Sequence, residues 1–357
     1  MSQRAKRIWI LIAAGVPEIL LMVWFGLNSP AVLDWMFRRA AYRELARPAP
    51  VLADKNELSV LLCGTGSPLP DRTRGGPCTL IAAGGKYYLV DAGLDAARDL
   101  ILWHLPLEKI AGVFLTHFHS DHIGDLGEVR LQTWVAGRKA PLAVYGPPGV
   151  ERVVNGFNEA YALDDGYRTK HHGAALLPPD AVALVPKPVM PGVVFDQDGL
   201  KVTAVKVKHE PANPSYGYRF DFHGRSIVIS GDTAPDEDLA HLARNADVLI
   251  HEGLNPEMVG VMHDALAAAN HPRQAKIFHD IPGYHTAPVD AARIANEAHV
   301  RLLVFSHIIP ILPNRFAGKL FLRGVSDVRP EGVELGHDGL VLRLPAGTTR
   351  IDESGLD

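Results

Sequence analysis

The sequence predicts an α/β fold in which two β-sheets are covered by helices. From about residue 56 onward, short apolar runs bounded by Gly and Pro recur along the chain, as is typical of strands. Hairpin-like strand pairs at 78–91 and 217–230 favour two sheets over one doubly wound sheet. The globular part is therefore expected to be a layered sandwich with its helices outside.

The predicted elements alternate along this part of the chain. The strands are, in order, LSVLLCG, TLIAAGG, KYYLVDAG, IAGVFLTH, APLAVYGPPG, LKVTAVKVKH, YGYRFDFHG, SIVISGDT, DVLIHEG and RLLVFSH. Helical patterns lie at 94–104, 123–136, 149–161 and 288–299. We interpret the segment 163–199, with its PP, PKP and PG pairs, as a long irregular insertion.

The N-terminal segment 1–29 is expected to be a membrane anchor or a signal segment. Residues 8–27 are apolar except around Pro17 and Glu18, and 20 such residues are long enough to span a bilayer. No clear small-x-small cleavage site follows Gly26, which favours a retained anchor, although a cleaved leader or an interfacial helix stays open. The basic residues before the stretch favour a catalytic domain on the periplasmic or extracytoplasmic side.

Two further segments complete the predicted organisation. Residues 30–55 are expected to form a juxtamembrane amphipathic helix, which mixes Trp35 and Phe37 with arginines, and a linker marked by Pro48 and Pro50. Residues 56–357 are expected to form the catalytic domain.

Composition excludes some classes of function. The 36 Lys and Arg against 40 Asp and Glu give a formal charge of -4, and no basic run tracks a phosphate backbone, which disfavours a dedicated nucleic-acid binder. Two cysteines are too few for a thiolate zinc site, so a metal here would need imidazole and carboxylate ligands. We interpret Cys63 and Cys78 as small buried residues near strand ends, and a bridge between them stays open.

Histidines and acidic residues follow the predicted strands. The stretch LTHFHSDHIGDL contains His117, His119, Asp121 and His122. Later strands run into His209, Asp232, His251 with Glu252, and His307. A lone histidine at a strand end is more often a satisfied polar residue, but side chains at several strand ends face a common edge. The set predicts a metal site, with His251 as a structural or supporting residue.

These residues resemble the metallo-β-lactamase fold hydrolases, whose signature is HxHxDH followed by a later His, an Asp and a final His. The matching positions are His117, His119, Asp121, His122, His209, Asp232 and His307. The resemblance covers about residues 57–345, and it is closest to the ribonuclease Z and arylsulfatase-like branch. That branch is indicated by GTGSP at 64–68, VDAG at 90–93, YGPPG at 145–149, GYR at 217–219, SGDT at 230–233, HEG at 251–253 and YHT at 284–286.

The resemblance implies an αββα sandwich that holds two zinc ions. His117, His119 and His209 would bind one ion, Asp121, His122 and His307 the second, and Asp232 would bridge them. The same ligands leave manganese or iron open. The pair would supply a bound hydroxide as nucleophile, which places Asp121 in the catalytic set as well as among the ligands.

The resemblance also implies a proton donor that is not a ligand. His285, oriented by Glu252, would stabilise or protonate the leaving oxygen. A structural alternative is that His285 helps to cap the helix that begins near Pro288, alongside Thr286.

The expected function is a metal-dependent hydrolase of a small ester, first a phosphodiester or an aryl sulfate. A lactonase or β-lactamase activity is the alternative, and a di-iron oxidoreductase is less favoured because the chain lacks a flavin-bearing domain. The resemblance places a basic tRNA-binding arm between the GYR and GDT strands, but Gly217 to Thr233 runs directly through. A tRNA partner is therefore expected to be absent, a membrane partner present, and a homodimer stays open.

Overall fold

The computed structural model describes residues 16, 17, 21, 23–50, 52 and 54–356, which form two compact units, Met1–Ala49 and Pro50–Asp357. The first unit contains helix α2 (Pro30–Leu45), none of whose residues is buried. Most of the apolar stretch 8–27 lies outside the described residues. Among the residues that are described, no helix has both the length and the apolar character needed to cross a membrane.

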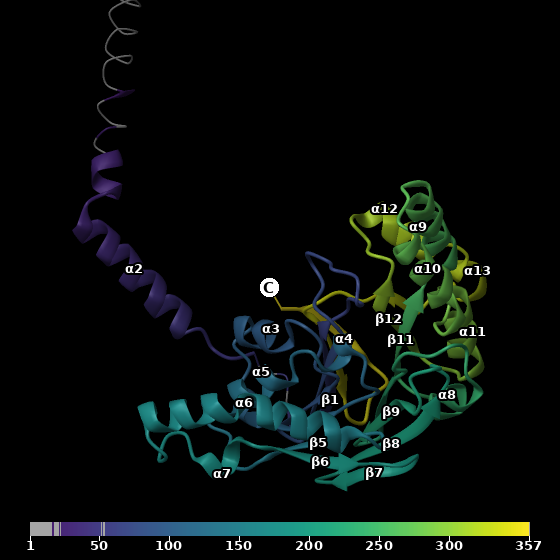
Figure 1. The fold of residues 1–357 in the computed structure, drawn as a ribbon, viewed down its shortest axis with the longest axis horizontal. Helices are drawn as coiled ribbons and strands as arrows, with labels where there is room; N and C mark the ends of the chain where they lie inside the picture. Colours follow the sequence, from purple (N-terminus) through teal and green to yellow (C-terminus); the bar gives the residue numbers. More distant parts are fainter. Residues whose placement is uncertain (1–15, 18–20, 22, 51, 53, 357) are drawn as a thin grey trace, which may run out of the picture. The chain divides into compact units, whose positions relative to one another are not determined.

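Two sheets form the second unit (Figure 1). The first has the strand order β15-β14-β1-β2-β3-β4-β5-β6 and the second the order β13-β12-β11-β10-β9-β8-β7. The first sheet consists of β1 (Glu57–Gly64), β2 (Cys78–Ala83), β3 (Lys86–Val90), β4 (Ile110–Phe114), β5 (Leu142–Gly146), β6 (Leu184–Pro188), β14 (Leu340–Pro345) and β15 (Asp352–Gly355). The second consists of β7 (Gly192–Gln197), β8 (Leu200–Val207), β9 (Ser215–Phe222), β10 (Arg225–Ile229), β11 (Val248–Leu254), β12 (Leu302–Ile309) and β13 (Val333–Leu335).

The central strands are apolar on both faces because each face packs on a different layer. In β1, Val60 and Leu62 belong to the core that joins the two sheets, whereas Leu61 and Cys63 point to the outer layer of the first sheet. Alternation between two buried faces explains the continuous apolar runs of the sequence.

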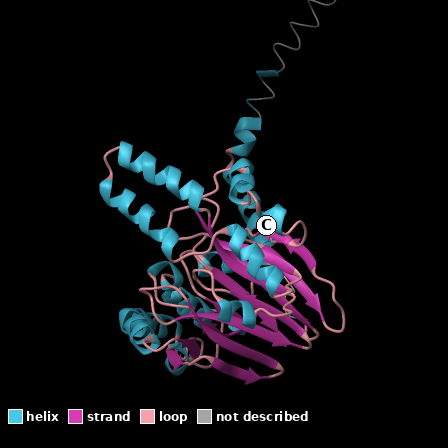
Figure 2. Ribbon diagram, turned by 90° about the vertical axis from the view of Figure 1, so that its right-hand side faces the viewer, coloured by secondary structure: helices cyan, strands magenta, loops and turns pink. Residues whose placement is uncertain are grey.

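Helices cover the outer faces of both sheets, and the strands lie together between them (Figure 2). On the first sheet these are α3 (Ala96–Leu102), α5 (Leu126–Val135) and α6 (Val150–His172). On the second sheet they are α8 (Glu237–Leu242), α11 (Pro288–Glu297), α12 (Arg315–Phe321) and α13 (Val325–Val328). The predicted α/β architecture with two sheets is confirmed.

The segment 163–199 differs from its prediction. It contains the second half of α6, the short helix α7 (Pro179–Val182) and strands β6 and β7, so it is not an irregular insertion. Helix α6 continues beyond the predicted 149–161, and residues at and after the predicted end have partners outside the helix. Tyr161 contacts a small apolar cluster that includes Trp134. Arg130, which is buried, forms an ion pair with Asp165 of the same helix.

A disulfide joins Cys63 at the end of β1 to Cys78 at the start of β2. Both residues are buried, as expected, and the bridge that the sequence left open is present. It ties together two strands that are also paired by hydrogen bonds through Gly64 and Cys78.

A helical hairpin interrupts the chain between β11 and α11. It consists of α9 (Pro256–Ala268) and α10 (Pro272–Asp280), and Figure 1 draws both helices beyond the end of β11. An apolar cluster that contains Leu254, Val259, Phe278 and Ile309 holds its base. The chain leaves the sheet after Leu254, two residues beyond Glu252, and returns through the 3-10 turn Ile281–Gly283 to His285.

Candidate metal centre

The predicted site residues converge at one edge of the two sheets. His117 follows β4, His209 follows β8 and Asp232 follows β10, while His307 lies within β12. The short helix α4 (Ser120–Ile123) carries Asp121 and His122, and His119 is its N-cap residue. All seven predicted ligands fall into groups whose donor atoms lie within 4.8 Å of one another.

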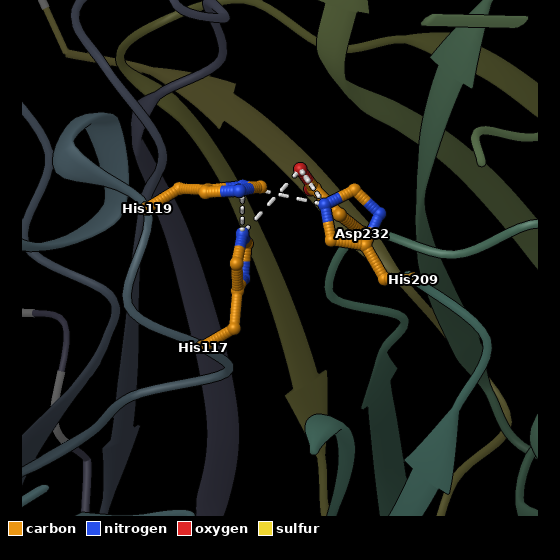
Figure 3. A group of neighbouring side chains, drawn as sticks. All are labelled: His117, His119, His209 and Asp232. Carbon is orange, nitrogen blue, oxygen red and sulfur yellow. Dashed lines mark hydrogen bonds and ion pairs between the residues drawn. The ribbon is translucent and has the colours of Figure 1, made fainter. Parts of the chain in front are cut away.

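The first group contains His117, His119, His209 and Asp232 (Figure 3). Nδ1 of His119 lies 2.9 Å from Nε2 of His117 and 3.4 Å from Nε2 of His209. Oδ2 of Asp232 lies 3.9 Å from Nε2 of His117 and 3.7 Å from Nε2 of His209. Figure 3 shows the three rings turned toward one another and toward this carboxylate.

The second group contains Asp121, His122 and His307. Oδ2 of Asp121 lies 3.5 Å from Nε2 of His122 and 3.4 Å from Nε2 of His307. Oδ2 of Asp232 lies 3.3 Å from both of these ring nitrogens. Asp232 therefore faces both groups with the same oxygen, which is the position that a bridging ligand needs.

The chemistry of these residues fits divalent cations. Donors that share a zinc ion at about 2.1 Å are about 3.4 Å apart, close to the spacings in both groups. Nε2 of His122 is buried, and it has no hydrogen-bond partner among the residues that the structure describes. A buried ring nitrogen that faces two carboxylates without a hydrogen bond is accounted for by a cation between them.

The pKa shifts of His117, His209 and Asp232 agree with this fit, whereas, although burial opposes it, the carboxylates of Asp232 and Asp91 raise the pKa of His122. Burial holds the pKa of His117 well below its usual value, and it also lowers the pKa of His209, so both rings keep a lone pair for a metal. Burial opposes ionisation of Asp232, but the nearby His307 and His122 hold the pKa of this carboxyl well below its usual value. The carboxylate is thus ionised in a place where a cation can neutralise it.

Glu252 and His285 form a pair beside the second group. Nδ1 of His285 donates a hydrogen bond of 3.1 Å to Oε1 of Glu252, and both side chains are buried. The ring of His285 stacks on that of His307, with centroids 5.5 Å apart. The structure also groups His285 with Asp232 and His307 as residues that could hold a metal, so a ligand role is the competing interpretation.

Three supporting contacts were not predicted. Oδ2 of Asp91 accepts a hydrogen bond of 2.8 Å from Nδ1 of His122 and another from the hydroxyl of Thr116. The carbonyl of Tyr284 accepts a hydrogen bond of 3.0 Å from Nδ1 of His209. The contacts with His122 and His209 fix each ring so that Nε2 faces the cluster. Asp91 directly follows strand β3 in the VDAG motif, and its place after a strand was the available signal.

The family comparison matches this site. A model of the metallo-beta-lactamase superfamily matches residues 71–307, which is more than half of the chain. The matched range contains every predicted metal ligand.

Sequence relatives and solved structures were compared with the chain as well, the first by sequence and the second by fold. The chain is 36% identical over 258 residues to a protein named ribonuclease Z from Mycolicibacterium gilvum, covering 71% of this chain and 85% of that protein. Its fold is similar to the metallo-beta-lactamase fold protein YhfI from Bacillus subtilis, with a TM-score of 0.57 and 20% identity over 80% of this chain and 99% of the other. Human tRNase Z, short form, gives a TM-score of 0.57 at 22% identity with the same two coverages.

These findings overturn three predictions. Membrane anchoring and an extracytoplasmic location are contradicted by the relatives, which are named ribonuclease Z. The exclusion of tRNA is contradicted by the same relatives. That exclusion combined the missing arm between β9 and β10 with the net charge of -4 and the expected membrane anchor. The absence of one binding element leaves other surfaces able to contact nucleic acid.

Proposed function

Because the chain belongs to the metallo-beta-lactamase superfamily, in its ribonuclease Z branch, we propose that this metal-dependent hydrolase cleaves phosphodiester bonds of RNA. The observation that carries the proposal is the shared position of Asp232 between two ligand groups, with the Glu252–His285 pair beside them. The 36% identity to ribonuclease Z favours a phosphodiester over an aryl sulfate or a lactone.

We assign the metal ligands as the sequence predicted. His117, His119 and His209 would hold one ion, Asp121, His122 and His307 would hold the other, and Asp232 faces both groups. Zinc is the proposed ion because imidazole and carboxylate suit it, and two such ions would activate water and offset charge on the phosphate.

The chain's own residues supply the rest of the chemistry. Nδ1 of His285 donates a hydrogen bond to Glu252, and although burial opposes it, this carboxylate raises the pKa of His285. The ring can therefore be protonated at both nitrogens and give the proton of Nε2 to the leaving oxygen. The backbone N–H groups of Thr233 and Thr286 donate to the same oxygen of Glu252 and hold it in place. His122 and His209 keep their orientation through Asp91 and the carbonyl of Tyr284.

The full-length chain, with zinc supplied, tests the proposal. It should contain about two zinc ions, as a dinuclear site requires, and should cleave both bis-p-nitrophenyl phosphate and a tRNA precursor. Chelation should abolish both activities. Asp232→Ala should lose metal and turnover together, whereas Asp198→Ala, which changes an exposed carboxylate paired with Lys86, should retain both.

Other outcomes would identify a different enzyme. Cleavage of p-nitrophenyl sulfate or a lactone without any phosphodiester cleavage would reject the proposed bond. Iron in place of zinc, with no hydrolysis, would reject the hydrolytic assignment of the site.

A further inference from the structure

A pocket of about 290 Å³ opens beside the first ligand group. It is lined by Phe118, Pro148 and the segment 211–214, and His117 and His119 form its boundary with the metal centre. A group bound in this pocket is therefore next to whatever the metal ligands hold. None of the contacts described for the metal centre uses Phe118, Pro148 or the segment 211–214.

Phe118 forms the aromatic wall of the pocket, and packing on the side away from the pocket holds it in place. Phe118 is half-buried and packs against the core on the outer face of the first sheet. Gly149 lies close to the ring, since a Cβ at this position would meet Cε2 of Phe118 at 3.3 Å. The ring therefore has a fixed place in the wall of the pocket.

The remaining walls are rigid and mostly apolar. Pro148, Pro211 and Pro214 have a restricted backbone, so a ligand that binds here does not have to order them. Asn213 supplies polar atoms at the exposed rim, where its Nδ2 donates a hydrogen bond of 2.7 Å to Glu210. No Lys or Arg lines this pocket, so it is unsuited to a second phosphate.

Its size and walls select a single flat ring system. A pocket of about 290 Å³ is at the lower end of the range for small-molecule sites, so it holds one small group rather than a folded partner. An aromatic ring beside a catalytic centre for phosphodiesters is suited to stacking with a base.

We propose that this pocket binds the nucleobase adjacent to the scissile phosphate, stacked on Phe118. The inference deepens the proposed function and rests on it. Phe118 is then a specificity-determining residue that separates nucleotide substrates from simple phosphate esters.

Calorimetry on the full-length chain in the presence of zinc tests this inference without requiring turnover. The probes are adenosine 5′-monophosphate and ribose 5-phosphate, which share a sugar phosphate and differ by the base. The Kd of ribose 5-phosphate should be about 10 or more times that of adenosine 5′-monophosphate, because stacking of a base on an aromatic side chain strengthens binding by about this factor.

Variants of Phe118 separate stacking from packing. Phe118→Leu keeps an apolar side chain against the core but removes the ring, and it should reduce the Kd ratio to below about 3. Phe118→Tyr keeps the ring and should keep the ratio. Phe316→Ala, which removes an exposed ring on α12, is the matched control and should leave the ratio unchanged.

The inference is overturned if the wild-type chain binds both probes equally, or if Phe118→Leu keeps the wild-type ratio. Parallel assays with bis-p-nitrophenyl phosphate distinguish the two proposals. Ring-dependent binding without phosphodiester cleavage would reject the proposed function alone, and cleavage with a ratio independent of Phe118 would reject the pocket alone.

Discussion

Oε1 of Glu252 lies 3.1 Å from Nδ1 of His285, although the two residues are 33 positions apart in the sequence. The same oxygen accepts hydrogen bonds from the backbone N–H groups of Thr233 and Thr286. Two backbone hydrogen bonds thus fix the carboxylate of Glu252, and this carboxylate in turn fixes the ring of His285 beside the metal ligands.

Glu252→Gln tests this relationship. A glutamine oxygen can still accept the three hydrogen bonds, but it lacks the charge that strengthens the bond to His285. We expect unchanged zinc content and a fall in kcat of about 100-fold for an RNA phosphodiester, whose leaving oxygen needs a proton. The fall should be much smaller for bis-p-nitrophenyl phosphate.

His285→Ala should give the same pattern, and His279→Ala, at an exposed histidine of α10, is its control. Elemental analysis with steady-state kinetics on both substrates measures the effect. Loss of zinc in the His285 variant, or equal losses on both substrates, would make this residue a ligand or a structural support.

Asp91→Asn should weaken metal binding without unfolding the chain. Asp91 lies at φ 60°, a conformation that Asn also tolerates, but the amide cannot accept as strongly from His122. Loss of such a supporting carboxylate typically reduces metal affinity about 10- to 100-fold. Competition with a chelating dye measures it, and Asp198→Asn is a matched exposed control. Wild-type affinity in the Asp91 variant would show that His122 does not depend on this contact.

We expect His251 to contribute to the loss of folding stability at low pH. It is fully buried in β11, and burial lowers its pKa although the adjacent Glu252 opposes the shift. Below about pH 6.5 the unfolded chain binds a proton at this ring more readily than the folded chain, so stability falls as the pH falls.

The dependence approaches about 1.4 kcal/mol per pH unit for one such group. His251→Asn can still donate to the carbonyl that Nδ1 of His251 contacts, and it does not titrate. Urea unfolding at pH 7, 6 and 5 should show a smaller loss of stability for this variant than for the wild type. Parallel pH profiles would assign the acid sensitivity to other groups.

Removal of the Cys63–Cys78 bridge should lower the free energy of unfolding. The two residues are separated by 15 positions, and a bridge of this span restricts the unfolded chain by about 3 kcal/mol. The double variant Cys63→Ala/Cys78→Ala should be less stable than the wild type in urea under oxidising conditions. The difference should shrink when reductant is present, and a difference that persists unchanged would reflect lost packing instead.

Strand ends explain why much of the site was predictable. His117, His209 and Asp232 each follow an apolar strand. The ends of these strands meet at the common edge of the two sheets, so the residues come together however far apart they are in the sequence. Asp91 obeys the same rule but was missed, because its partner His122 comes from a helix and no spacing in the sequence relates the two.

Features that depend on distant packing were predicted less well. Helix α6 runs to His172, and its later part pairs Asp165 with Arg130, which precedes the helix by more than a dozen residues. Proline pairs in 163–199 indicated breaks, but they mark the start of α7 and the ends of strands instead of an irregular loop. The missing arm between β9 and β10 was a true observation from which the absence of a tRNA partner did not follow.

Hydrogen bonds close the α9–α10 hairpin at its base, next to Glu252 and His285. The N–H of Leu254 donates to the carbonyl of Thr286, and the N–H of Thr286 donates to the carboxylate of Glu252. The entropic cost of closing a loop grows slowly with its length, so segments of different lengths can be inserted between Leu254 and Thr286. The hairpin can therefore be replaced in evolution, which would change substrate selectivity, while the catalytic residues at its base stay in place.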